Sequence, residues 1–378
     1  MYLCGIQMRE TGGNVMEQRI IISQNFQNDL AMALMECERD RIFVLTDATT
    51  NEKCWPLLSN FFGLKQARQI VIPSGDNNKN IESLSHVWKE LQNGATRHSC
   101  LINLGGGMVT DLGGFAASTF KRGINFINIP TTLLSMVDAS VGGKTGINFG
   151  GLKNEVGVFS EPRFVIINAA FLNTLDTQNL LSGYAEMLKH GLLSNDAMWA
   201  ELLSFEPEQV NDAAQTVADG SGNVMIKRLQ RMIADSVEVK KHIVEKDPKE
   251  QNIRKALNLG HTFGHAFESW SYTGGNTPVL HGYAVAFGLV CELYLSVVKC
   301  GFPTEKMRQA VAYIRSHYGS LPISCDDYDT LIELMTHDKK NSAGTINFTL
   351  LSDIGDIRIN QTATVEEIKD ALDFLREG

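Results

Sequence analysis

The stretch SCLINLGGGMVTDLGGF, residues 99–115, reads as a buried strand that ends in a glycine turn and leads into a helix. Three further β-rich runs alternate with helical patterns along the first part of the chain, at residues 41–47, 67–75 and 124–132. This βαβ alternation predicts a doubly wound, Rossmann-like α/β domain, whose ligands lie at the carboxyl ends of the strands. We expect this domain to span residues 1–170.

After about residue 170 the pattern becomes helical, over residues 180–193, 223–247, 281–301 and 304–319. We expect residues 171–378 to form a mainly α-helical domain that includes a short β-hairpin within residues 345–359. The total of 378 residues suits two domains, and a pocket between two domains is a common place for a small molecule. Residues 1–15 are expected to be a disordered extension, with Met16 as a second candidate start.

The composition narrows the class of protein. Hydrophobic residues make up 43% of the chain and charged residues 20%, and the net charge of −9 disfavours nucleic acid and anionic membranes as partners. We find no stretch that is long and apolar enough to span a bilayer, and the N-terminus lacks a signal-peptide core. The seven cysteines form no CxxC pair, so we expect reduced thiols and a cytoplasmic location.

The glycine turn offers a place for a dinucleotide. Gly105, Gly106 and Gly107 would let the backbone approach a pyrophosphate closely, and Asp111 follows in the helix. The turn is not a GxGxxG motif, so a tight turn with a capping aspartate explains it equally well. Asp47, at the end of another expected strand, could hold a ribose hydroxyl or simply cap a helix, and both readings stay open.

Residues 129–157 form an interrupted, glycine-rich segment with spaced lysines. Lysines in such a setting are suited to bind phosphate or carboxylate as point charges, although each lysine taken alone fits a solvated surface equally well. The polar residues of interest in this segment are Thr131, Thr132, Asp138, Lys144, Lys153 and Asn154.

Histidines and one glutamate in the helical part have the chemistry of a metal site. His261 and His265 lie four residues apart, which puts both rings on one helix face. Glu186 lies in the apolar setting GYAEML, and His281 begins an apolar helix. Spacing alone favours Glu186, His261 and His265 as ligands of a divalent metal with an open coordination position. The alternatives are a surface ion pair between Glu186 and Lys189, and histidines that are satisfied within the core.

Six motifs together resemble the 3-dehydroquinate synthase family, in the family's order and with nearly its spacing: GGGMVTDLGGFAASTFKRG, PTTLLSMVDASVGGKTGIN, LKNEVGVF, AEMLKHG, LNLGHTFGHAFE and LHGYAVAFG. The resemblance runs from about Arg41 to beyond Lys340. It implies an α/β NAD-binding domain, a helical metal- and substrate-binding domain, one divalent metal (Zn²⁺ or Co²⁺) and a homodimer. By resemblance His265 binds substrate and handles protons, and the metal ligands are Glu186, His261 and His281.

The resemblance also assigns roles along the motifs. The residues implied to contact NAD are Asp47, Asp76, Lys79, Gly105, Gly106, Gly107, Asp111, Thr131, Thr132 and Lys153. Those implied to contact substrate are Asp138, Lys144, Asn154, Lys189, Lys240, Arg254, Asn258 and His265, with Lys339 or Lys340 as a further anion contact. Arg122 corresponds to the arginine that reaches the phosphate site of the partner subunit in the family's homodimer.

The chain departs from the family pattern at two positions. Asp76 stands where the family usually has a glutamate, and the shorter acid is still expected to bind the adenosine ribose. Tyr283 replaces the glutamate of the family motif LHGEAVAIG, which puts the surroundings of the metal in question. The segment between His265 and His281 is also slightly longer than usual.

The implied substrate is 3-deoxy-D-arabino-heptulosonate 7-phosphate, which becomes 3-dehydroquinate and phosphate in the second step of the shikimate pathway. Such an enzyme oxidises a secondary alcohol with NAD, eliminates phosphate, returns the hydride and closes the ring by an aldol step.

Two alternative functions stay open. Another sugar-phosphate cyclase, of the valiolone or deoxy-inosose type, acts on a substrate without a carboxylate and is expected to alter some of Lys240, Arg254 and Asn258. A metal- and NAD-dependent polyol dehydrogenase would not need the set of lysines.

Overall fold

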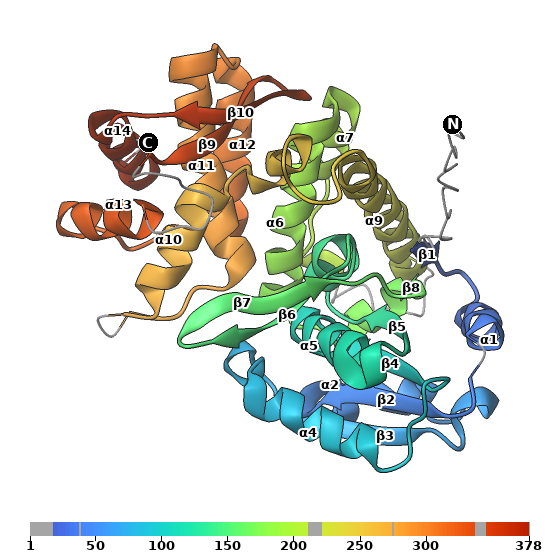
Figure 1. The fold of residues 1–378 in the computed structure, drawn as a ribbon. Helices are drawn as coiled ribbons and strands as arrows, with labels where there is room; N and C mark the ends of the chain where they lie inside the picture. Colours follow the sequence, from blue (N-terminus) through green and yellow to red (C-terminus); the bar gives the residue numbers. More distant parts are fainter. Residues whose placement is uncertain (1–17, 38, 211–220, 274–275, 337–344, 378) are drawn as a thin grey trace, which may run out of the picture.

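The computed structural model describes residues 18–37, 39–210, 221–273, 276–336 and 345–377 (Figure 1). The expected extension over residues 1–15, the candidate start Met16 and the expected anion contacts Lys339 and Lys340 lie outside the described residues. Figure 1 shows the sheet in the lower half of the view and the helices of the second half of the chain above it.

The first half of the chain folds around a six-stranded parallel sheet in the order β1-β8-β5-β4-β2-β3. Its strands include the four expected from the β-rich runs, so the doubly wound prediction is confirmed. From β2 the chain forms β3 on one side and then crosses back to form β4 on the other, which makes a topological switch point between β2 and β4. The strands are β1 (Arg19–Ile22), β2 (Ile42–Asp47), β3 (Arg68–Ile72), β4 (Cys100–Gly105), β5 (Asn125–Pro130) and β8 (Phe164–Ile167).

The side chains of the inner strand β2 enter two different cores, because successive residues point to opposite faces of a sheet. Phe43 and Leu45 of β2 pack in one core with Val87 and Leu112, whereas Val44 packs in the larger core on the other face. Both faces are therefore covered, as a parallel sheet requires. The helices of this part are α1 (Phe26–Glu36), α2 (Ala48–Lys53), α3 (Trp55–Leu58), α4 (Ile81–Gln92) and α5 (Gly107–Thr119).

The segment of residues 129–157 is more regular than its glycine content suggests. It holds one π-helical turn, η4 (Ser135–Ala139), and an antiparallel hairpin formed by β6 (Lys144–Phe149) and β7 (Leu152–Phe159). Single π-helical turns are frequent at functional sites. Figure 1 shows the hairpin between the sheet and helix α10 (His261–Ser271). The hairpin thereby brings its lysines within reach of both halves of the chain.

The second half is mainly helical, as predicted, and the expected hairpin is present as β9 (Asn347–Asp353) and β10 (Asp356–Thr362). The expected domain boundary at residue 170 falls within the short helix η5 (Ala169–Thr174), between the last strand of the sheet and the first long helix. Besides α10, the helices of this half are α6 (Thr177–Ser194), α7 (Asp196–Leu203), α9 (Ser221–Lys246), α11 (His281–Cys300), α12 (Thr304–Tyr318), α13 (Tyr328–Thr336) and α14 (Val365–Glu377).

Helix α11 is the central helix of this half and packs against α6, α10, α12, α14 and β9. Within the described ranges it is the one helix that is long and apolar enough to cross a bilayer, so the expectation that no stretch qualifies is wrong. However, 67% of its most apolar window is buried inside the protein. A helix that is apolar on all sides and buried is typical of a protein core.

Candidate functional site

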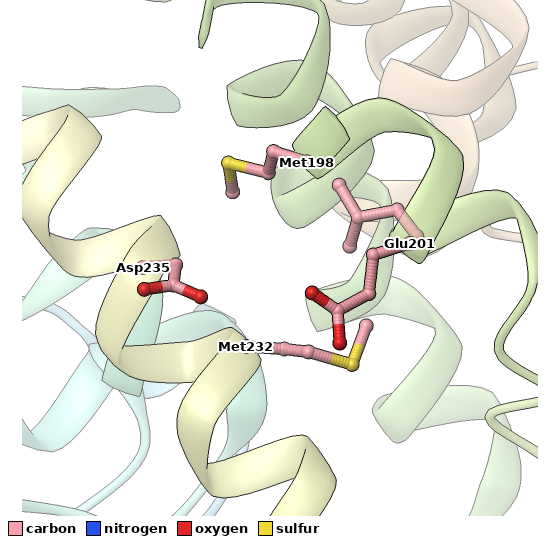
Figure 2. A pocket seen from close by; sticks show the side chains of 5 residues that line it. Met198, Glu201, Met232 and Asp235 are labelled. Atoms are coloured by element: carbon pink, nitrogen blue, oxygen red, sulfur yellow. The ribbon is translucent and has the colours of Figure 1, made fainter. Parts of the chain in front are cut away.

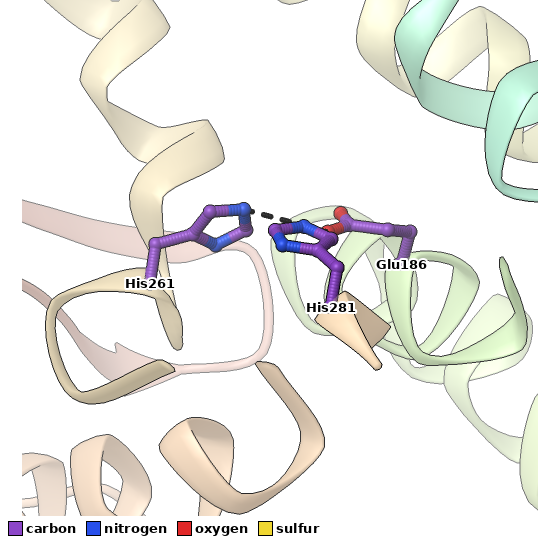
Figure 3. Close-up of side chains that lie close together, drawn as sticks. All are labelled: Glu186, His261 and His281. Carbon is purple, nitrogen blue, oxygen red and sulfur yellow. Dashed lines mark hydrogen bonds and ion pairs between the residues drawn. The ribbon is translucent and has the colours of Figure 1, made fainter. Parts of the chain in front are cut away.

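Three potential ligand atoms converge where helices α6, α10 and α11 meet. Glu186 comes from the middle of α6, whereas His261 and His281 are the first residues of α10 and α11. The Nε2 atoms of His261 and His281 lie 3.4 and 3.2 Å from Glu186 Oε1. One ligand atom from each residue lies within 4.8 Å of the other two. Figure 3 shows the two rings and the carboxylate pointing toward one another.

This set of donors fits a divalent cation. One carboxylate and two imidazole nitrogens form a known type of catalytic zinc site, in which a further position stays open. Glu186 Oε2 is buried without an aligned hydrogen bond, although Lys189 Nζ lies 2.5 Å away. Burial opposes the charge on Glu186, but Lys189 and His261 outweigh burial and hold the pKa of Glu186 well below its usual range. The carboxylate is therefore ionised and suited to bind a metal.

The second ring nitrogen of each of these histidines also has a partner. His261 Nδ1 lies 3.1 Å from Leu259 O, and His281 Nδ1 lies 3.4 Å from Glu268 Oε2. Neither oxygen can donate, so each Nδ1 carries a hydrogen and Nε2 is the atom that faces Glu186. Burial disfavours a charged His281 ring, but the carboxylates of Glu186 and Glu268 raise its pKa to about 10. A bound cation takes the place of the Nε2 proton.

His265 lies beside this group. The centre of its ring is 5.3 Å from that of His261 and 6.2 Å from that of His281. Within the described part of the chain, the ligand-type atoms of Glu186 group with those of His261 and His281 and not with His265. His261 and His265 therefore face one region, as their spacing predicts. The histidine that joins His261 and Glu186 in the group is, however, His281 of helix α11.

Tyr283, which stands where the family pattern has a glutamate, packs against Tyr318. Its ring lies edge-on to that of Tyr318 at 5.1 Å, and the Tyr318 hydroxyl donates to Leu181 O at 2.9 Å. The carboxylate beside His281 is that of Glu268, which was part of the histidine motif but had been given no role. The replacement at residue 283 therefore leaves an acid next to His281.

A set of buried and half-buried charges links Glu186 of the histidine group to the π-helical turn η4. Lys189 donates to Leu257 O at 2.9 Å and lies 4.0 Å from Asp138 Oδ1. Lys240, on α9, donates to Asp138 Oδ1 at 2.7 Å. Burial opposes the charge on Asp138, but Lys240 outweighs it and keeps the pKa of Asp138 well below its usual range. The expected substrate contacts Asp138, Lys189 and Lys240 thus lie together, with Asp138 in the π-helical turn.

Arg254 is a buried cation in the short helix η6 (Ile253–Asn258), and its residue surface is only 2% exposed. Its guanidinium donates to Pro248 O at 2.6 Å and to Gly142 O at 3.1 Å, while its Nε has no hydrogen-bond partner. None of the described carboxylates forms an ion pair with it, and burial lowers its pKa. A buried guanidinium of this kind is suited to a ligand that carries a carboxylate or phosphate.

Glu250 joins two other expected substrate contacts. It forms an ion pair with Lys144, and Asn258 Nδ2 donates to Glu250 Oε1 at 3.3 Å. Burial opposes its charge, but Lys144 outweighs burial and lowers the pKa of Glu250. Its φ of 58° lies in the left-handed region, where residues other than glycine are uncommon. Sequence reasoning missed Glu250, because an acid in a charged, irregular stretch carries no local signal.

The expected cofactor residues gather at the switch point of the sheet. Asp47 ends β2, and its Oδ1 accepts hydrogen bonds from Thr50 N at 2.9 Å and from Ser74 Oγ at 3.0 Å. These contacts correspond to the helix-cap reading of Asp47, since Thr50 lies in the first turn of α2. The glycine turn follows β4, on the other side of the switch point.

The glycine turn leaves no room for a side chain at Gly105 and little room at Gly106. A Cβ on Gly105 would lie 2.5 Å from the Val109 side chain, and one on Gly106 would lie 3.1 Å from Thr132 Cγ2. Thr131 N donates to Gly105 O at 3.0 Å, which ties the end of β5 to the turn. The expected contacts Gly105, Gly106, Thr131 and Thr132 therefore lie together at adjacent strand ends.

Lys79 is the centre of a second polar group on this side, and it is 5% exposed. Its Nζ donates to Asp111 Oδ2 at 3.1 Å and to Asn154 Oδ1 at 2.6 Å, and it lies 3.6 Å from Asp76 Oδ1. Burial raises the pKa of Asp111 even though Lys79 is adjacent. Lys153 Nζ, on the hairpin, lies 3.4 Å from Asp76 Oδ2. The structure thus places Asn154, an expected substrate contact, among the expected cofactor contacts.

Arg122 lies apart from these groups, beside a hollow of about 250 Å³ that Arg163 and Glu161 also line. Lys121 and Arg122 both have left-handed backbones, with φ of 50° and 69°. Two such residues in succession hold the loop in an uncommon shape.

A separate crevice between α7 and α9 belongs to no expected site (Figure 2). It is lined by Met198, Glu201, Leu202, Met232 and Asp235, and its volume is about 10 Å³. That is room for about one water molecule. The crevice is therefore too small to hold a substrate or a dinucleotide.

Comparison with known proteins places the chain in a family. The family model described as 3-dehydroquinate synthase N-terminal matches residues 69–182, and the model described as 3-dehydroquinate synthase C-terminal matches residues 183–341. The chain belongs to the 3-dehydroquinate synthase family. It is 53% identical over 363 residues to a 3-dehydroquinate synthase of Parabacteroides distasonis, and the match covers 96% of this chain and 99% of that protein. The resemblance read from the six motifs is therefore confirmed over nearly the whole chain.

Solved structures with the same fold include two cyclases. A 2-epi-5-epi-valiolone synthase from Streptomyces hygroscopicus, with NAD⁺ and Zn²⁺ bound, matches with a TM-score of 0.79 and 23% identity, over 100% of this chain and 99% of that one. A 2-deoxy-scyllo-inosose synthase, complexed with carbaglucose-6-phosphate, NAD⁺ and Co²⁺, matches with a TM-score of 0.76 and 23% identity over 96% of each chain. At this identity the likeness concerns the fold, and it agrees with the two-domain prediction for this member of the 3-dehydroquinate synthase family.

Proposed function

We propose that the chain is a 3-dehydroquinate synthase, which converts 3-deoxy-D-arabino-heptulosonate 7-phosphate to 3-dehydroquinate and phosphate. The observation that carries this assignment within the family is Arg254, a buried guanidinium without a described carboxylate partner. The substrate has a carboxylate as well as a phosphate, and a buried arginine is costly unless an anion pairs with it. A cyclase whose substrate lacks a carboxylate offers Arg254 the phosphate alone, which is one anionic partner fewer.

Glu186, His261 and His281 are the residues that hold the divalent metal, Zn²⁺ or Co²⁺. The residues at the switch point hold NAD. When bound, NAD supplies a reversible hydride acceptor for the secondary alcohol of the substrate, and the metal supplies a Lewis acid for the same oxygen. The NAD contacts are Asp47, Asp76, Lys79, Gly105, Gly106, Gly107, Asp111, Thr131, Thr132 and Lys153.

The remaining polar residues bind and orient the substrate. Lys189 pairs with the buried Glu186 and Lys240 with the half-buried Asp138, and an anionic substrate adds a further partner for each ammonium group. His265 takes or returns a proton at the reacting alcohol, and the 5.3 Å between its ring centre and that of His261 supports this role. Much of the catalytic effect comes from holding one flexible molecule in successive orientations. The other substrate contacts are Asp138, Lys144, Asn154, Arg254 and Asn258, with Lys339 or Lys340 in addition.

The proposal extends to the assembly and location of the protein. The chain acts as a cytoplasmic homodimer in which Arg122 reaches the phosphate site of the partner subunit. The two left-handed residues at the Arg122 loop support this role, because they hold the arginine in a defined loop at the surface. Residues 1–170 form the NAD-binding domain, and residues 171–378 form the metal- and substrate-binding domain.

One assay tests the function directly. Purified protein with NAD, Zn²⁺ or Co²⁺ and the heptulosonate phosphate is expected to release inorganic phosphate with no net gain of NADH absorbance. Phosphate release from a heptulose phosphate without the carboxylate, and none from the heptulosonate, would instead assign the protein to the valiolone or inosose type. Net formation of NADH with a polyol would assign it to the dehydrogenases.

A further inference from the structure

Glu268 touches both halves of the site, although neither the motifs nor the family comparison gives it a role. It lies on α10, two turns after His261, and is 8% exposed. Its Oε2 lies 3.4 Å from His281 Nδ1, and its Oε1 accepts a hydrogen bond from Lys153 Nζ at 2.6 Å. The two oxygens of one carboxylate therefore contact a ligand-type histidine and the β6–β7 hairpin.

The contact with His281 is of a kind that orients metal ligands. A histidine that binds a metal through one ring nitrogen usually donates the other N–H to a carboxylate or carbonyl, which fixes its tautomer and ring orientation. His261 has this support from its own backbone, through Leu259 O. His281 is the first residue of its helix, and its Nδ1 faces only the side chain of Glu268 among the described partners. The orientation of His281 therefore depends on one carboxylate from another helix.

The contact with Lys153 holds that carboxylate in place from the other side. Lys153 Nζ also lies 3.4 Å from Asp76 Oδ2 and 5.1 Å from the ring centre of Tyr272. A carboxylate fixed at one oxygen by a lysine has less freedom to rotate away from the histidine at its other oxygen. The resulting series of contacts runs from Asp76 through Lys153 and Glu268 to His281.

We propose that Glu268 is a positioning residue that sets the orientation of His281 for metal binding. Lys153, a proposed NAD contact on the β6–β7 hairpin, holds Glu268 in that position. This inference rests on the proposed function, because it takes Glu186, His261 and His281 as the metal ligands. It adds a structural link by which a proposed NAD contact, Lys153, supports a proposed metal ligand, His281, through Glu268.

The test is the affinity for Co²⁺ in the absence of substrate. Metal-free full-length protein is titrated with Co²⁺ against a competing chelator, and the visible absorption of bound Co²⁺ reports the ligand geometry. Glu268→Gln keeps the size of the side chain but not its charge, and we expect Co²⁺ to bind about 10- to 100-fold more weakly with an altered spectrum. Lys153→Met is expected to weaken Co²⁺ binding in the same direction by a smaller factor.

A matched control separates positioning from a general effect on α10. Asp327 accepts a hydrogen bond from Trp270 Nε1 at 3.0 Å, so Asp327→Asn removes another carboxylate that contacts the same helix away from His281. We expect Asp327→Asn to bind Co²⁺ as the wild type does. If Glu268→Gln does not fold, Glu268→Asp replaces it, since the charge is kept but the reach is shorter and weaker Co²⁺ binding is still expected.

The outcomes distinguish the two proposals. If the wild type binds Co²⁺ and the Glu268 variants bind it equally well, the positioning role is wrong and the proposed function stands. An equal loss in Asp327→Asn would also overturn the positioning role. If the wild type itself does not bind Co²⁺, the proposed metal site fails, and the inference about Glu268 fails with it.

Discussion

The cofactor side and the metal side of the site are built in different ways. On the cofactor side, Asp47 and the glycine turn end two neighbouring strands, so the backbone of the sheet alone brings them together. On the metal side, Glu186 and His281 are 95 residues apart on different helices, and their surroundings are buried charges. One half of the site depends on chain topology, and the other depends on a few mutually supporting side chains.

This difference predicts different sensitivities to mutation. A strand end keeps its position when one side chain changes, because many backbone hydrogen bonds hold it. Removing a buried carboxylate has a larger effect on stability, because its partner is left as an unpaired charge in the protein interior. We therefore expect the largest effects on the metal side and the smallest on the cofactor side.

The largest effect is expected for Glu186→Gln. It removes the acidic donor of the metal group and leaves Lys189, which is almost fully buried, without its partner at 2.5 Å. Losing a residue that only contacts a metal ligand typically weakens metal binding or activity by about 10- to 100-fold. Because Glu186 is itself a proposed ligand, we expect Co²⁺ binding and phosphate release to fall by more than about 100-fold. We also expect the free energy of unfolding to fall by about 3–5 kcal/mol. Metal titration, the phosphate assay and urea unfolding measure the three quantities.

The control for this change is Glu201→Gln on α7. Glu201 forms surface ion pairs with Arg228 at 3.6 Å and Arg231 at 3.3 Å. Exposed pairs contribute about 0–1 kcal/mol, so this variant should be close to the wild type. Equal effects of the two substitutions would contradict the distinction between buried and exposed acids.

The next effect is expected for Arg254→Gln. Truncating one partner of a buried charge contact costs about 2–5 kcal/mol, so kcat/KM for the heptulosonate phosphate should fall by at least about 30-fold. The dissociation constants of Co²⁺ and NAD should change little, because Arg254 contacts neither set of expected residues. Steady-state kinetics and the two titrations measure these quantities. A variant with normal kcat/KM would remove the main support for a carboxylate-bearing substrate.

A smaller effect concerns acid stability on the metal side. His190 is fully buried next to Lys189, and burial lowers its pKa to about 3. The unfolded chain takes up this proton near pH 6.5, so the contribution of His190 is complete above that pH. It is lost as the pH falls toward 3, by up to about 1.4 kcal/mol per pH unit.

His190→Gln removes this dependence. The difference in unfolding free energy between wild type and variant should therefore shrink by about 1.6 kcal/mol between pH 6.5 and pH 5. Urea unfolding of metal-free protein at both pH values measures the difference without a contribution from metal release. A difference that stays constant with pH would show that His190 does not stay neutral in the folded protein.

The smallest effect is expected at Asp47, where a pair of variants separates the two readings of this residue. Asp47→Ala removes the cap of α2 and should lower the free energy of unfolding by about 0.5–2 kcal/mol. Asp47→Asn keeps a capping oxygen and should leave stability nearly unchanged. If Asp47 also contacts the ribose, both variants weaken NAD binding. If only Asp47→Ala does so, the residue acts through the cap alone.

Much of the fold was accessible from the sequence, because its signals are local. The β-rich runs, the four longest helical patterns and the late hairpin all correspond to elements of the structure. The hairpin of β6 and β7 and the π-helical turn were missed, since closely spaced glycines hide both the strand and the helix periodicity. Helix α11 was predicted as a helix, but its length and apolarity would also suit a membrane span, and only its burial in the structure distinguishes the two.

The candidate site likewise has a part that local spacing predicted and a part that depends on contacts between distant elements. Spacing on one helix pointed to His261 and His265, because residues four apart share a face. The position of Glu186 between His261 and His281 could come only from family resemblance or from the packing of three helices. Glu250 and Glu268 were given no role for the same reason, since their partners lie on other elements.

By itself, the sequence determined the parallel sheet, the helical second half and the positions of the polar residues along them, because strand and helix periods are properties of short segments. Spacing had already offered Glu186 and Lys189 as a surface ion pair, but only the tertiary structure decided that this pair is buried. It also decided that Asp138 faces Lys240 and that Glu268 faces Lys153 and His281. Burial makes such pairings strong, and burial is a property of the assembled core.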